Sequence, residues 1–347
     1  MARLGDLTNI KTGKLDANAS SESGQYPFFT CAVEPLKIDS YSYDCECVLV
    51  AGNGDLNVKY YNGKFDAYQR TYIIESKDKE TLHVPYLYYF LDLYVEELRK
   101  QAIGGVIKYI KLGNLTEAQI PLPSLAKQKN IVETLNKSYH LVSLRKKQLQ
   151  KLDDLVKARF MEMFGEPNTE SAKYATTPLG ELTICFDSRR KPVKEGERKS
   201  MQGPYPYYGA TGIVDHVNDY RLDGTFLLVS EDGKALEFRN YDIAFIASGK
   251  IWVNNHAHVL QCKPVLNMLF LQYYIKYMDI SHWVTGIDQK KLNRENMDTI
   301  PVMVPPIEIQ EEYANLIQQT DKSKLSIQQG LEKLKTLKKS LMQQYFG

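Results

Sequence analysis

Two stretches of the chain place cations and amides at short spacing. One spans residues 59–70 and the other residues 250–256. Lysine and arginine bind phosphate, whereas arginine, asparagine, glutamine and histidine also hydrogen-bond to the edges of bases. This composition predicts contact with nucleic acid, and the alternative is a solvated surface whose tyrosines belong to the core. The candidate residues are Lys59, Lys64, Tyr68, Gln69 and Arg70 in the first stretch, and Lys250, Asn254, Asn255 and His256 in the second.

Further cations precede both stretches. Arg189, Arg190 and Lys191 form a basic run in the second half, and Lys11 and Lys14 are its smaller counterpart in the first. The segment 127–159 also carries nine lysines or arginines against three acids, although the whole chain has a net charge of only +2. A basic helix face is more often a solvated surface than a binding site, so both interpretations stay open for this segment.

The side chains that bind metals or perform catalysis do not follow a known pattern. The five cysteines, at positions 31, 45, 47, 185 and 262, form an odd set, which predicts free thiols. Cys-x-Cys at 45–47 and His-x-His at 256–258 lie in different halves and lack the usual spacing of zinc ligands. The stretch Glu231-Asp232-Gly233-Lys234 has the acids of a nuclease metal site but falls at a predicted hairpin turn, and Lys234 remains a candidate DNA contact. We expect no metal site.

Two catalytic signatures are also missing from the sequence. It contains no Gly-x4-Gly-Lys-Ser/Thr phosphate loop, and no Asn-Pro-Pro-Tyr or Asp-Pro-Pro-Tyr stretch of the kind that amino-methyltransferases carry. These observations favour a binding protein over an enzyme.

The elements that position the candidate residues occur twice. Residues 128–165 align without a gap with residues 310–347, at a constant offset of 182 positions. Weaker matches upstream pair Leu4-Gly5-Asp6-Leu7 with Leu179-Gly180-Glu181-Leu182, and Tyr26-Pro27-Phe28-Phe29 with Tyr205-Pro206-Tyr207-Tyr208. A repeat of about 180 residues far exceeds a solenoid unit, so each copy is predicted to be a domain with its own core.

Each half is expected to begin with short strands and to continue with an amphipathic helix. Asn53-Gly54 between apolar runs predicts a hairpin that joins strands at 46–51 and 58–61. The other elements are strands at 226–230, 241–247 and 257–262, helices at 85–102 and 265–277, and a last strand halted by proline at 120–123 and at 300–306. This order indicates an α+β fold in each half.

The repeated terminal segments are predicted to be long helices that pack on each other. Apolar residues recur every seven positions in both, without an intervening proline, although Ser138, Arg145, Lys324 and Lys338 interrupt the pattern. The chain order lets the helices run antiparallel. The predicted seam residues are Leu135, Val142, Leu149, Leu152 and Val156 in the first helix, and Ile327, Leu331, Leu334 and Leu341 in the second, with Leu155 in a neighbouring row.

The predicted boundaries follow from these elements. Globular domains are expected at 1–123 and 166–305, and long spacer helices at 124–165 and 306–347. Hydrophobic residues make up 43% of the chain and charged residues 25%, which is typical of a soluble globular protein. The longest apolar runs have the length of strands, and the amino terminus has no signal-peptide core. We therefore expect a cytoplasmic protein.

Several short motifs occur in the same order in both halves, and in this arrangement the chain resembles the DNA-specificity subunits of type I restriction-modification systems. The shared motifs are the Leu-Gly-Asp/Glu-Leu opening, the Tyr-Pro-aromatic-aromatic strand, the proline-bounded entry with Gln128 or Gln310 just inside a long helix, and the Phe-Gly exit. Residues 285–292 are similar to the family's Gly-x-x-Gln-Lys-x-Leu segment. This adds Gln289, Lys290 and Lys291 to the candidate DNA contacts. The first half lacks a clear Gln-Lys, so Lys108 or Lys111 is expected to take its place.

The resemblance implies a non-catalytic subunit with two pseudo-twofold-related α/β target-recognition domains, separated by a two-helix antiparallel coiled coil. Each domain would recognise half of a split, asymmetric sequence in double-stranded DNA. The helices would dock two methyltransferase subunits, which use S-adenosylmethionine and through which the motor-nuclease subunits join. No cofactor is expected in this chain. The alternatives left open are a structural adaptor without DNA function and a self-contained enzyme.

Overall fold

The computed structural model describes residues 1–238, 241–287 and 289–347, and its described residues form two compact units. Unit 1 comprises Met1–Lys147 and Gln328–Gly347, and unit 2 comprises Gln148–Ile327. Each unit therefore contains one globular half of the repeat together with a part of both long helices. Among the residues that the structure describes, no helix has the length and apolar character needed to cross a membrane.

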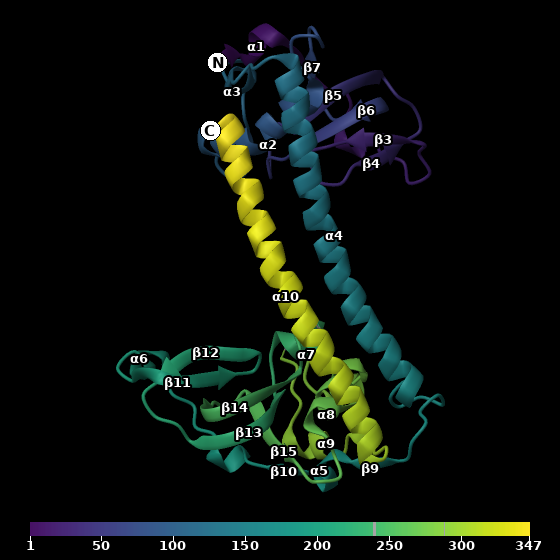
Figure 1. The fold of residues 1–347 in the computed structure, drawn as a ribbon, viewed down its shortest axis with the longest axis vertical. Helices are drawn as coiled ribbons and strands as arrows, with labels where there is room; N and C mark the ends of the chain where they lie inside the picture. Colours follow the sequence, from purple (N-terminus) through teal and green to yellow (C-terminus); the bar gives the residue numbers. More distant parts are fainter. Residues whose placement is uncertain (239–240, 288) are drawn as a thin grey trace. The chain divides into compact units, whose positions relative to one another are not determined.

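A six-stranded sheet forms the body of unit 1 (Figure 1). Its strands are antiparallel except for β3 (Tyr26–Phe29) and β6 (Val58–Ala67), which are parallel and pair Phe28 with Asp66. Val48 and Leu49 of β5 (Tyr43–Ala51) are buried on opposite faces, because the sheet has apolar layers on both sides. In spatial order the strands are β2 (Thr8–Thr12), β7 (Thr71–Ser76), β5 (Tyr43–Ala51), β6 (Val58–Ala67), β3 (Tyr26–Phe29) and β4 (Leu36–Ile38).

Helix α2 (Val84–Gln101) packs on one face of this sheet. Its apolar side meets Val48, Val50 and Ile74 of the sheet, and Leu135 and Phe346 of the long helices complete the core. The remaining elements are η1 (Ala17–Ala19), α1 (Leu4–Leu7), α3 (Leu112–Thr116), and the two-residue strands β1 (Ala2–Arg3) and β8 (Gln119–Ile120), which pair with each other. The predicted hairpin and the helix at 85–102 are confirmed.

Unit 2 repeats this topology strand for strand. Strands β11 (Gln202–Gly209) and β14 (Ala244–Val253) are parallel, with Tyr207 opposite Trp252, as β3 and β6 are in unit 1. The strand order is β10 (Thr183–Cys185), β15 (Ala257–Cys262), β13 (Leu222–Ser230), β14 (Ala244–Val253), β11 (Gln202–Gly209) and β12 (Gly212–Val217). The internal repeat inferred from the sequence is thus visible in the fold.

Helix α8 (Met268–Tyr277) covers the sheet of unit 2, where Phe270 and Tyr274 are completely buried. It begins three residues later than predicted, because the Asn267 side chain caps it by accepting from the backbone amides of Leu269 and Phe270. The other elements are α5 (Leu179–Leu182), η2 (Asp187–Arg189), α6 (Glu195–Arg198), α7 (Lys234–Phe238), η3 (Ser281–Trp283), α9 (Arg294–Asp298), β9 (Thr176–Pro178) and β16 (Pro301–Met303).

One predicted turn has a different structure, and a repeated glycine lies within paired strands of both units. The hairpin turn expected at Glu231–Gly233 is a longer connection, because α7 follows it before β14 begins. Asn62-Gly63-Lys64, which matches Ser248-Gly249-Lys250 in the repeat, lies inside β6, with Gly63 opposite Cys45. Gly63 and Gly249 both have positive φ, at 139° and 86°. The glycines therefore mark local irregularities within paired strands.

The long helices are α4 (Leu125–Phe164) and α10 (Ile307–Phe346), with 40 residues each (Figure 1). At 1.5 Å per residue each is about 60 Å long. The repeated glutamines explain where they begin. Gln128 accepts from His83 N and donates to Thr81 O and Pro123 O, and Gln310 accepts from Asn267 N and donates to Val265 O and Pro305 O. Each buried amide thus fixes its long helix to the chain before α2 or α8.

Within each unit the two long helices run antiparallel. In unit 1 the ammonium of Lys338 lies 3.5 Å from the ring centre of Tyr139, and in unit 2 the Tyr313 hydroxyl donates to Val156 O. Burial of the seam is uneven. Three of the predicted seam residues are buried, namely Leu135, Val156 and Leu331. The other six are only half-buried: Val142, Leu149, Leu152, Ile327, Leu334 and Leu341. Leu155, placed by the heptad pattern in a neighbouring row, is half exposed.

Candidate nucleic-acid interface

The candidate stretches of the two halves form equivalent turns. Tyr68–Arg70 joins β6 to β7, and Asn254–His256 joins β14 to β15. Tyr68 donates its amide to Phe29 O over 2.9 Å, and Asn254 donates its amide to Tyr208 O over 3.0 Å. The side chains of Gln69 and Arg70, and of Asn255 and His256, are exposed. Each unit therefore presents two polar side chains at the same turn, with different chemistry.

A second loop lies beside each turn. Residues 103–109 are closed by reciprocal backbone hydrogen bonds between Ile103 and Tyr109, and residues 285–291 by the same bonds between Thr285 and Lys291. Tyr109 also pairs with Asn53, and Lys291 with Asp232. The loops thus have matching positions in the two units. Asp288, which belongs to the Gly-x-x-Gln-Lys-x-Leu segment, lies outside the described residues.

This correspondence locates the counterpart of the Gln-Lys pair in the first half. Lys108 precedes Tyr109 as Lys290 precedes Lys291, so Lys108 takes the place of Lys290. Lys111 corresponds instead to Asn293, since each is the residue before a short helix, α3 or α9. Of the two lysines proposed for this place, Lys108 therefore has the matching position and Lys111 does not.

A hollow of about 440 Å³ lies between the loop and the turn of unit 1. It is lined by Asn53, Arg70, Ile107 and Tyr109.

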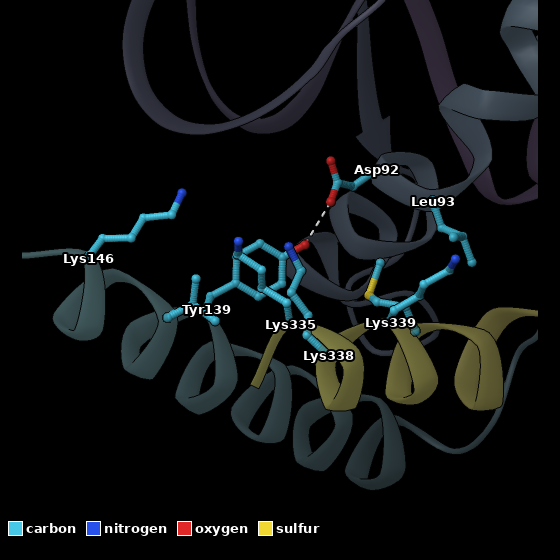
Figure 2. A pocket seen from close by; sticks show the side chains of 9 residues that line it. Asp92, Leu93, Tyr139, Lys146, Lys335, Lys338 and Lys339 are labelled. Atoms are coloured by element: carbon cyan, nitrogen blue, oxygen red, sulfur yellow. Dashed lines mark hydrogen bonds between the residues drawn. The ribbon is translucent and has the colours of Figure 1, made fainter. Parts of the chain in front are cut away.

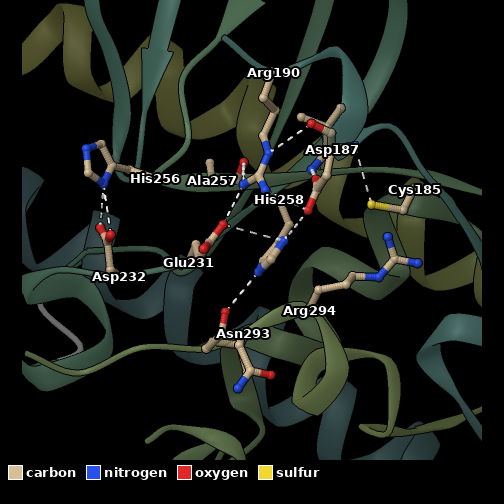
Figure 3. A network of polar contacts seen from close by, with 12 residues as sticks. Cys185, Asp187, Arg190, Glu231, Asp232, His256, Ala257, His258, Asn293 and Arg294 are labelled. Atoms are coloured by element: carbon tan, nitrogen blue, oxygen red, sulfur yellow. Dashed lines mark hydrogen bonds and ion pairs between the residues drawn. The ribbon is translucent and has the colours of Figure 1, made fainter. Parts of the chain in front are cut away.

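In unit 2 an ion-pair network supports the turn (Figure 3). Arg190 binds Glu231 over 2.5 Å and Asp187 over 3.1 Å, and it donates to Ala257 O. His258 Nδ1 lies 2.6 Å from Asp187 Oδ2, and His258 Nε2 lies 2.8 Å from Leu292 O. Burial works to raise the pKa of Asp187, but contacts with His258, Val259 N and Arg190 hold that pKa below its usual range. The pKa of Glu231 is likewise lowered, because Arg190 and Lys291 outweigh the effect of burial.

The network changes the roles of two predicted DNA contacts. The Arg190 side chain is only 16% exposed and donates to four acceptor atoms on three residues of the unit, so it supports the fold. Asn254 is also buried, and its side-chain oxygen accepts from His256 N to shape the turn. Lys291 binds Glu231 over 3.0 Å while half of its side chain remains exposed. The sequence did not indicate the contacts of Glu231 with Arg190 and Lys291, because these partners lie far apart along the chain.

Asp187, Glu231 and His258 also have the composition of a metal site. Their ligand atoms lie within 4.8 Å of one another. However, the same carboxylates already accept from Arg190 and Lys291, which supply the positive charge that a metal ion would bring. The arrangement is therefore that of an internal ion-pair network.

Unit 1 builds the equivalent support from neutral groups. Tyr72 takes the place of His258, and its hydroxyl donates to Ile110 O over 3.2 Å, as His258 Nε2 contacts Leu292 O. Gly52 takes the place of Glu231. Gly52 donates its amide to Arg70 O, just as Glu231 donates to His256 O. The two units thus share a backbone frame but surround it with different charges.

A cluster of one lysine and two tyrosines also occurs in both units. The Lys64 ammonium lies 4.7 Å from the ring centre of Tyr41, which packs on Tyr26 at 4.9 Å. The Lys250 ammonium lies 4.6 Å from the ring centre of Tyr220, which packs on Tyr205 at 5.2 Å. Hydrogen bonding and charge interaction with Tyr41 raise the pKa of Lys64, and charge interaction with Tyr220 raises that of Lys250. Both ammonium groups are exposed cations held at a fixed place.

The other predicted cations lie in varied surroundings. Lys11 pairs with Glu75 over 2.5 Å, and Lys59 is half-buried beside Asn57, so burial lowers its pKa. Six other candidate side chains are exposed: Lys14, Lys108, Arg189, Lys191, Lys234 and Gln289. Lys290 is half-buried. Arg189 and Lys191 line a hollow of about 520 Å³ with Arg221 and Trp252. Sequence reasoning missed Arg221, whose guanidinium lies 5.3 Å from the Trp252 ring, because nothing in its own segment indicates that contact.

The helices of unit 1 carry a separate basic hollow of about 390 Å³ (Figure 2). Lys146 of α4 and Lys335, Lys338 and Lys339 of α10 line it. Tyr139 donates to Asp92 over 2.7 Å beneath Lys338, and burial lowers the pKa of that lysine. Leu93, Val142 and Met342 supply its apolar lining. Lys338, which interrupts the heptad pattern, is therefore one wall of this hollow.

Comparison with known proteins agrees with this architecture. The family model "Type I restriction modification DNA specificity domain" matches residues 1–154 and again residues 172–338. The chain therefore belongs to this family and contains two such domains. Proteins of this family are the non-catalytic, DNA-recognising components of restriction-modification complexes, in which they assemble with other subunits.

Individual relatives extend over nearly the whole chain. The specificity subunit of the type I restriction enzyme EcoDI from Escherichia coli is 26% identical over 99% of this chain and 86% of its own length. The fold is similar to the crystal structure of a type I S subunit from M. genitalium, with a TM-score of 0.66, 18% identity, and coverage of 100% of this chain and 95% of the other. A chain from a study of type I complex assembly gives a TM-score of 0.60 at 14% identity, over 99% and 96% of the two chains.

Proposed function

We propose that this chain determines the sequence specificity of a type I restriction-modification enzyme, with each unit recognising one half of a bipartite, asymmetric target in double-stranded DNA. The observation that carries the proposal is the duplicated pair of turn and loop. The backbone frame is the same in both units, but Arg70 and Gln69 stand where His256 and Asn255 stand in the other. Two domains with the same backbone frame but different exposed side chains are suited to recognising two different half-sites.

The exposed side chains of this frame have the chemistry of base recognition. Arginine and glutamine form bidentate hydrogen bonds with guanine and adenine in the major groove. Asp232 contacts His256 Nδ1 at 2.8 Å, which leaves Nε2 available for a base edge. We assign phosphate contacts to the exposed cations around the frame. These are Lys14, Lys64 and Lys108 in unit 1, and Arg189, Lys191, Lys234 and Lys250 in unit 2, to which we add the half-buried Lys290. Lys11, Lys59 and Lys291 are less available because of their internal contacts.

The long helices are proposed to dock the catalytic partners. Five large apolar side chains on α4 and α10 are exposed: Leu141, Leu144, Leu155, Leu325 and Leu337. Solvated helix faces rarely carry so many apolar residues, whereas partner-binding faces do. We assign these faces and the basic hollow around Lys338 to two methyltransferase subunits, which hold S-adenosylmethionine and through which motor-nuclease subunits join. The functional segments would then be 1–123, 124–165, 166–305 and 306–347, acting in the cytoplasm, where the host DNA lies.

The experiment is to co-express the full chain with the methyltransferase subunit encoded beside it and to map methylated adenines across the host genome. The proposal predicts a split, asymmetric motif that requires this chain. Exchanging the turn residues of one unit, Gln69 and Arg70 for Asn and His, should change only one half of the motif. A stable complex without sequence-dependent methylation would favour the adaptor alternative and contradict the proposal.

A further inference from the structure

The loop at residues 103–109 exposes adjacent aliphatic side chains at its tip. Val106 is fully exposed, at 103% of its reference surface, and Ile107 is 61% exposed. The corresponding loop of unit 2 carries Ile287, which is 95% exposed. Single exposed apolar residues are common on protein surfaces. Here, however, aliphatic side chains stand at the tip of the same loop in both units, where a solvated tip normally has polar residues.

The loop backbone is constrained. The two hydrogen bonds between Ile103 and Tyr109, of 3.0 and 2.8 Å, close its base. Gly104 has φ of 117°, and a Cβ at this position would lie 2.5 Å from Ile107 O. Gly286 has φ of 95°, and its Cβ would lie 2.1 Å from Gln289 O. Both tips therefore depend on a glycine to turn tightly and present the residues that follow.

The surroundings of the tip are those of the proposed DNA interface. Ile107 lines the same hollow as Asn53 and Arg70, and the next residue along the chain is the exposed Lys108. In unit 2 the loop with Ile287 is bound to Asp232, which also contacts His256. An aliphatic side chain is thus placed beside an amide, a guanidinium and an ammonium. This combination suits a groove of DNA, which offers apolar base surface beside polar base edges and phosphates.

We propose that the loop tips, Val106 and Ile107 in unit 1 and Ile287 in unit 2, make apolar contact with bases of the bound DNA. This inference rests on the proposed DNA recognition and adds a second kind of contact to it. The apolar partner is either the C5 methyl group of thymine in the major groove or the face of a base that the tip partly unstacks. A contact of this kind contributes affinity without neutralising a phosphate.

The test uses the full chain in complex with its methyltransferase subunit and a labelled duplex that carries the motif mapped in the host. The V106S/I107S variant should bind this duplex about tenfold more weakly. Its dependence of affinity on salt should equal that of the wild type, because no phosphate contact is removed. The matched control is V33S, which replaces a residue of unit 1 that is 62% exposed, like Ile107, but does not line the hollow.

Two modified duplexes identify the apolar partner. If the tip contacts a methyl group, uracil in place of thymine in the unit 1 half-site weakens the wild type but not V106S/I107S. If the tip unstacks a base, 2-aminopurine at that place becomes more fluorescent with the wild type than with the variant. Either result supports the inference. The I287S variant, in the corresponding loop of unit 2, should affect the other half-site.

Three outcomes distinguish a failure of this inference from a failure of the proposed DNA recognition. Equal binding of wild type and V106S/I107S overturns the inference and leaves the proposed function intact. Loss of the methyltransferase subunit from the variant complex also overturns it, because the tip would then contact protein. If the wild-type complex binds every duplex alike, the proposed function fails and the inference fails with it.

Discussion

The carbonyl oxygen of Arg70 accepts a hydrogen bond from the amide of Gly52 over 2.7 Å. This bond ties the turn after β6 to the end of β5, while the Arg70 side chain stays exposed. Arg70→Ala should therefore leave the fold intact and weaken recognition at one half-site by about 1–3 kcal/mol. Methylation mapping of the variant checks this, because the motif should relax in one half only.

His256→Ala is the matching variant in unit 2 and should relax the other half of the motif. Equal loss of affinity for all duplexes would instead make Arg70 a phosphate contact. No loss at all would remove Arg70 from the interface.

The repeated lysine and tyrosine cluster makes a different prediction. Lys64 lies over Tyr41 in unit 1 and Lys250 lies over Tyr220 in unit 2, although the side chains of the neighbouring turns differ. A contact shared by two units with different half-sites should be independent of base sequence. Lys64→Gln and Lys250→Gln should each weaken binding to all duplexes and reduce the slope of log K against log salt by about 0.9. Titrations at several salt concentrations measure this slope.

Lys322→Gln is the control for the lysine variants, since Lys322 is an exposed lysine of α10 outside the proposed interface. Its salt dependence should equal that of the wild type. A loss confined to one half-site would show that the lysine contacts a base, contrary to the prediction.

The ion-pair network of unit 2 should make that unit sensitive to acid. The folded-state pKa values of Asp187 and Glu231 lie below the ordinary values of 3.8 and 4.5. Their contribution to stability is therefore complete above about pH 5 and is lost as the pH falls through the lowered values. Both tryptophans, Trp252 and Trp283, belong to unit 2, so thermal unfolding followed by tryptophan fluorescence reports this unit.

Asp187→Asn tests the network at neutral pH. The change leaves Arg190 and His258 without their shared carboxylate and should destabilise unit 2 by about 3–5 kcal/mol. The exposed pair of Asp242 and Lys276 supplies the control, since Asp242→Asn should change stability by at most about 1 kcal/mol. Equal effects of the two substitutions would contradict a structural role for the network.

The elements that the sequence predicted best are those with local signals. The long helices have heptads over 40 residues without a proline, and the helix at 85–102 has its own apolar periodicity. The duplication also predicted that the same topology would occur twice. By contrast, Asp187, Arg190, Glu231 and His258 meet only because β10, β13 and β15 pair in a particular register. Such contacts depend on tertiary structure, which periodicity does not contain.

The candidate interface shows the same division. Both candidate stretches contain a turn, at 68–70 and at 254–256, and Gly63-Lys64 and Gly249-Lys250 lie at the same distance before these turns. The contacts of Arg190 with Glu231 and Ala257 were not predicted, because these partners are distant in sequence. The exposed tip at Val106 and Ile107 was missed, since an aliphatic pair in a sequence indicates burial unless the structure shows otherwise.

The buried glutamines at the start of the long helices provide a further test. Gln128 and Gln310 are completely buried, and each satisfies one backbone amide and two carbonyls. Gln310→Ala leaves these groups unpaired and should destabilise unit 2 by about 1–3 kcal/mol, measured by tryptophan fluorescence in denaturant. Gln150→Ala, at an exposed position of α4, should have little effect. If Gln310→Ala does not change the stability of unit 2, water has replaced the hydrogen bonds of the Gln310 side-chain amide.

The basic hollow of unit 1 makes the last prediction, which concerns partner binding. Lys335 and Lys339 are exposed, whereas Lys338 is partly buried over Tyr139, so charge at the first two positions can be reversed without disturbing the packing. If an acidic segment of a methyltransferase subunit docks there, K335E/K339E should lower its affinity at least tenfold, because like charges then face each other. High salt should reduce the difference between variant and wild type. The control K322E places a new acid elsewhere on α10, and co-purification with the methyltransferase measures both. Unchanged binding by K335E/K339E would assign docking to the exposed leucines alone.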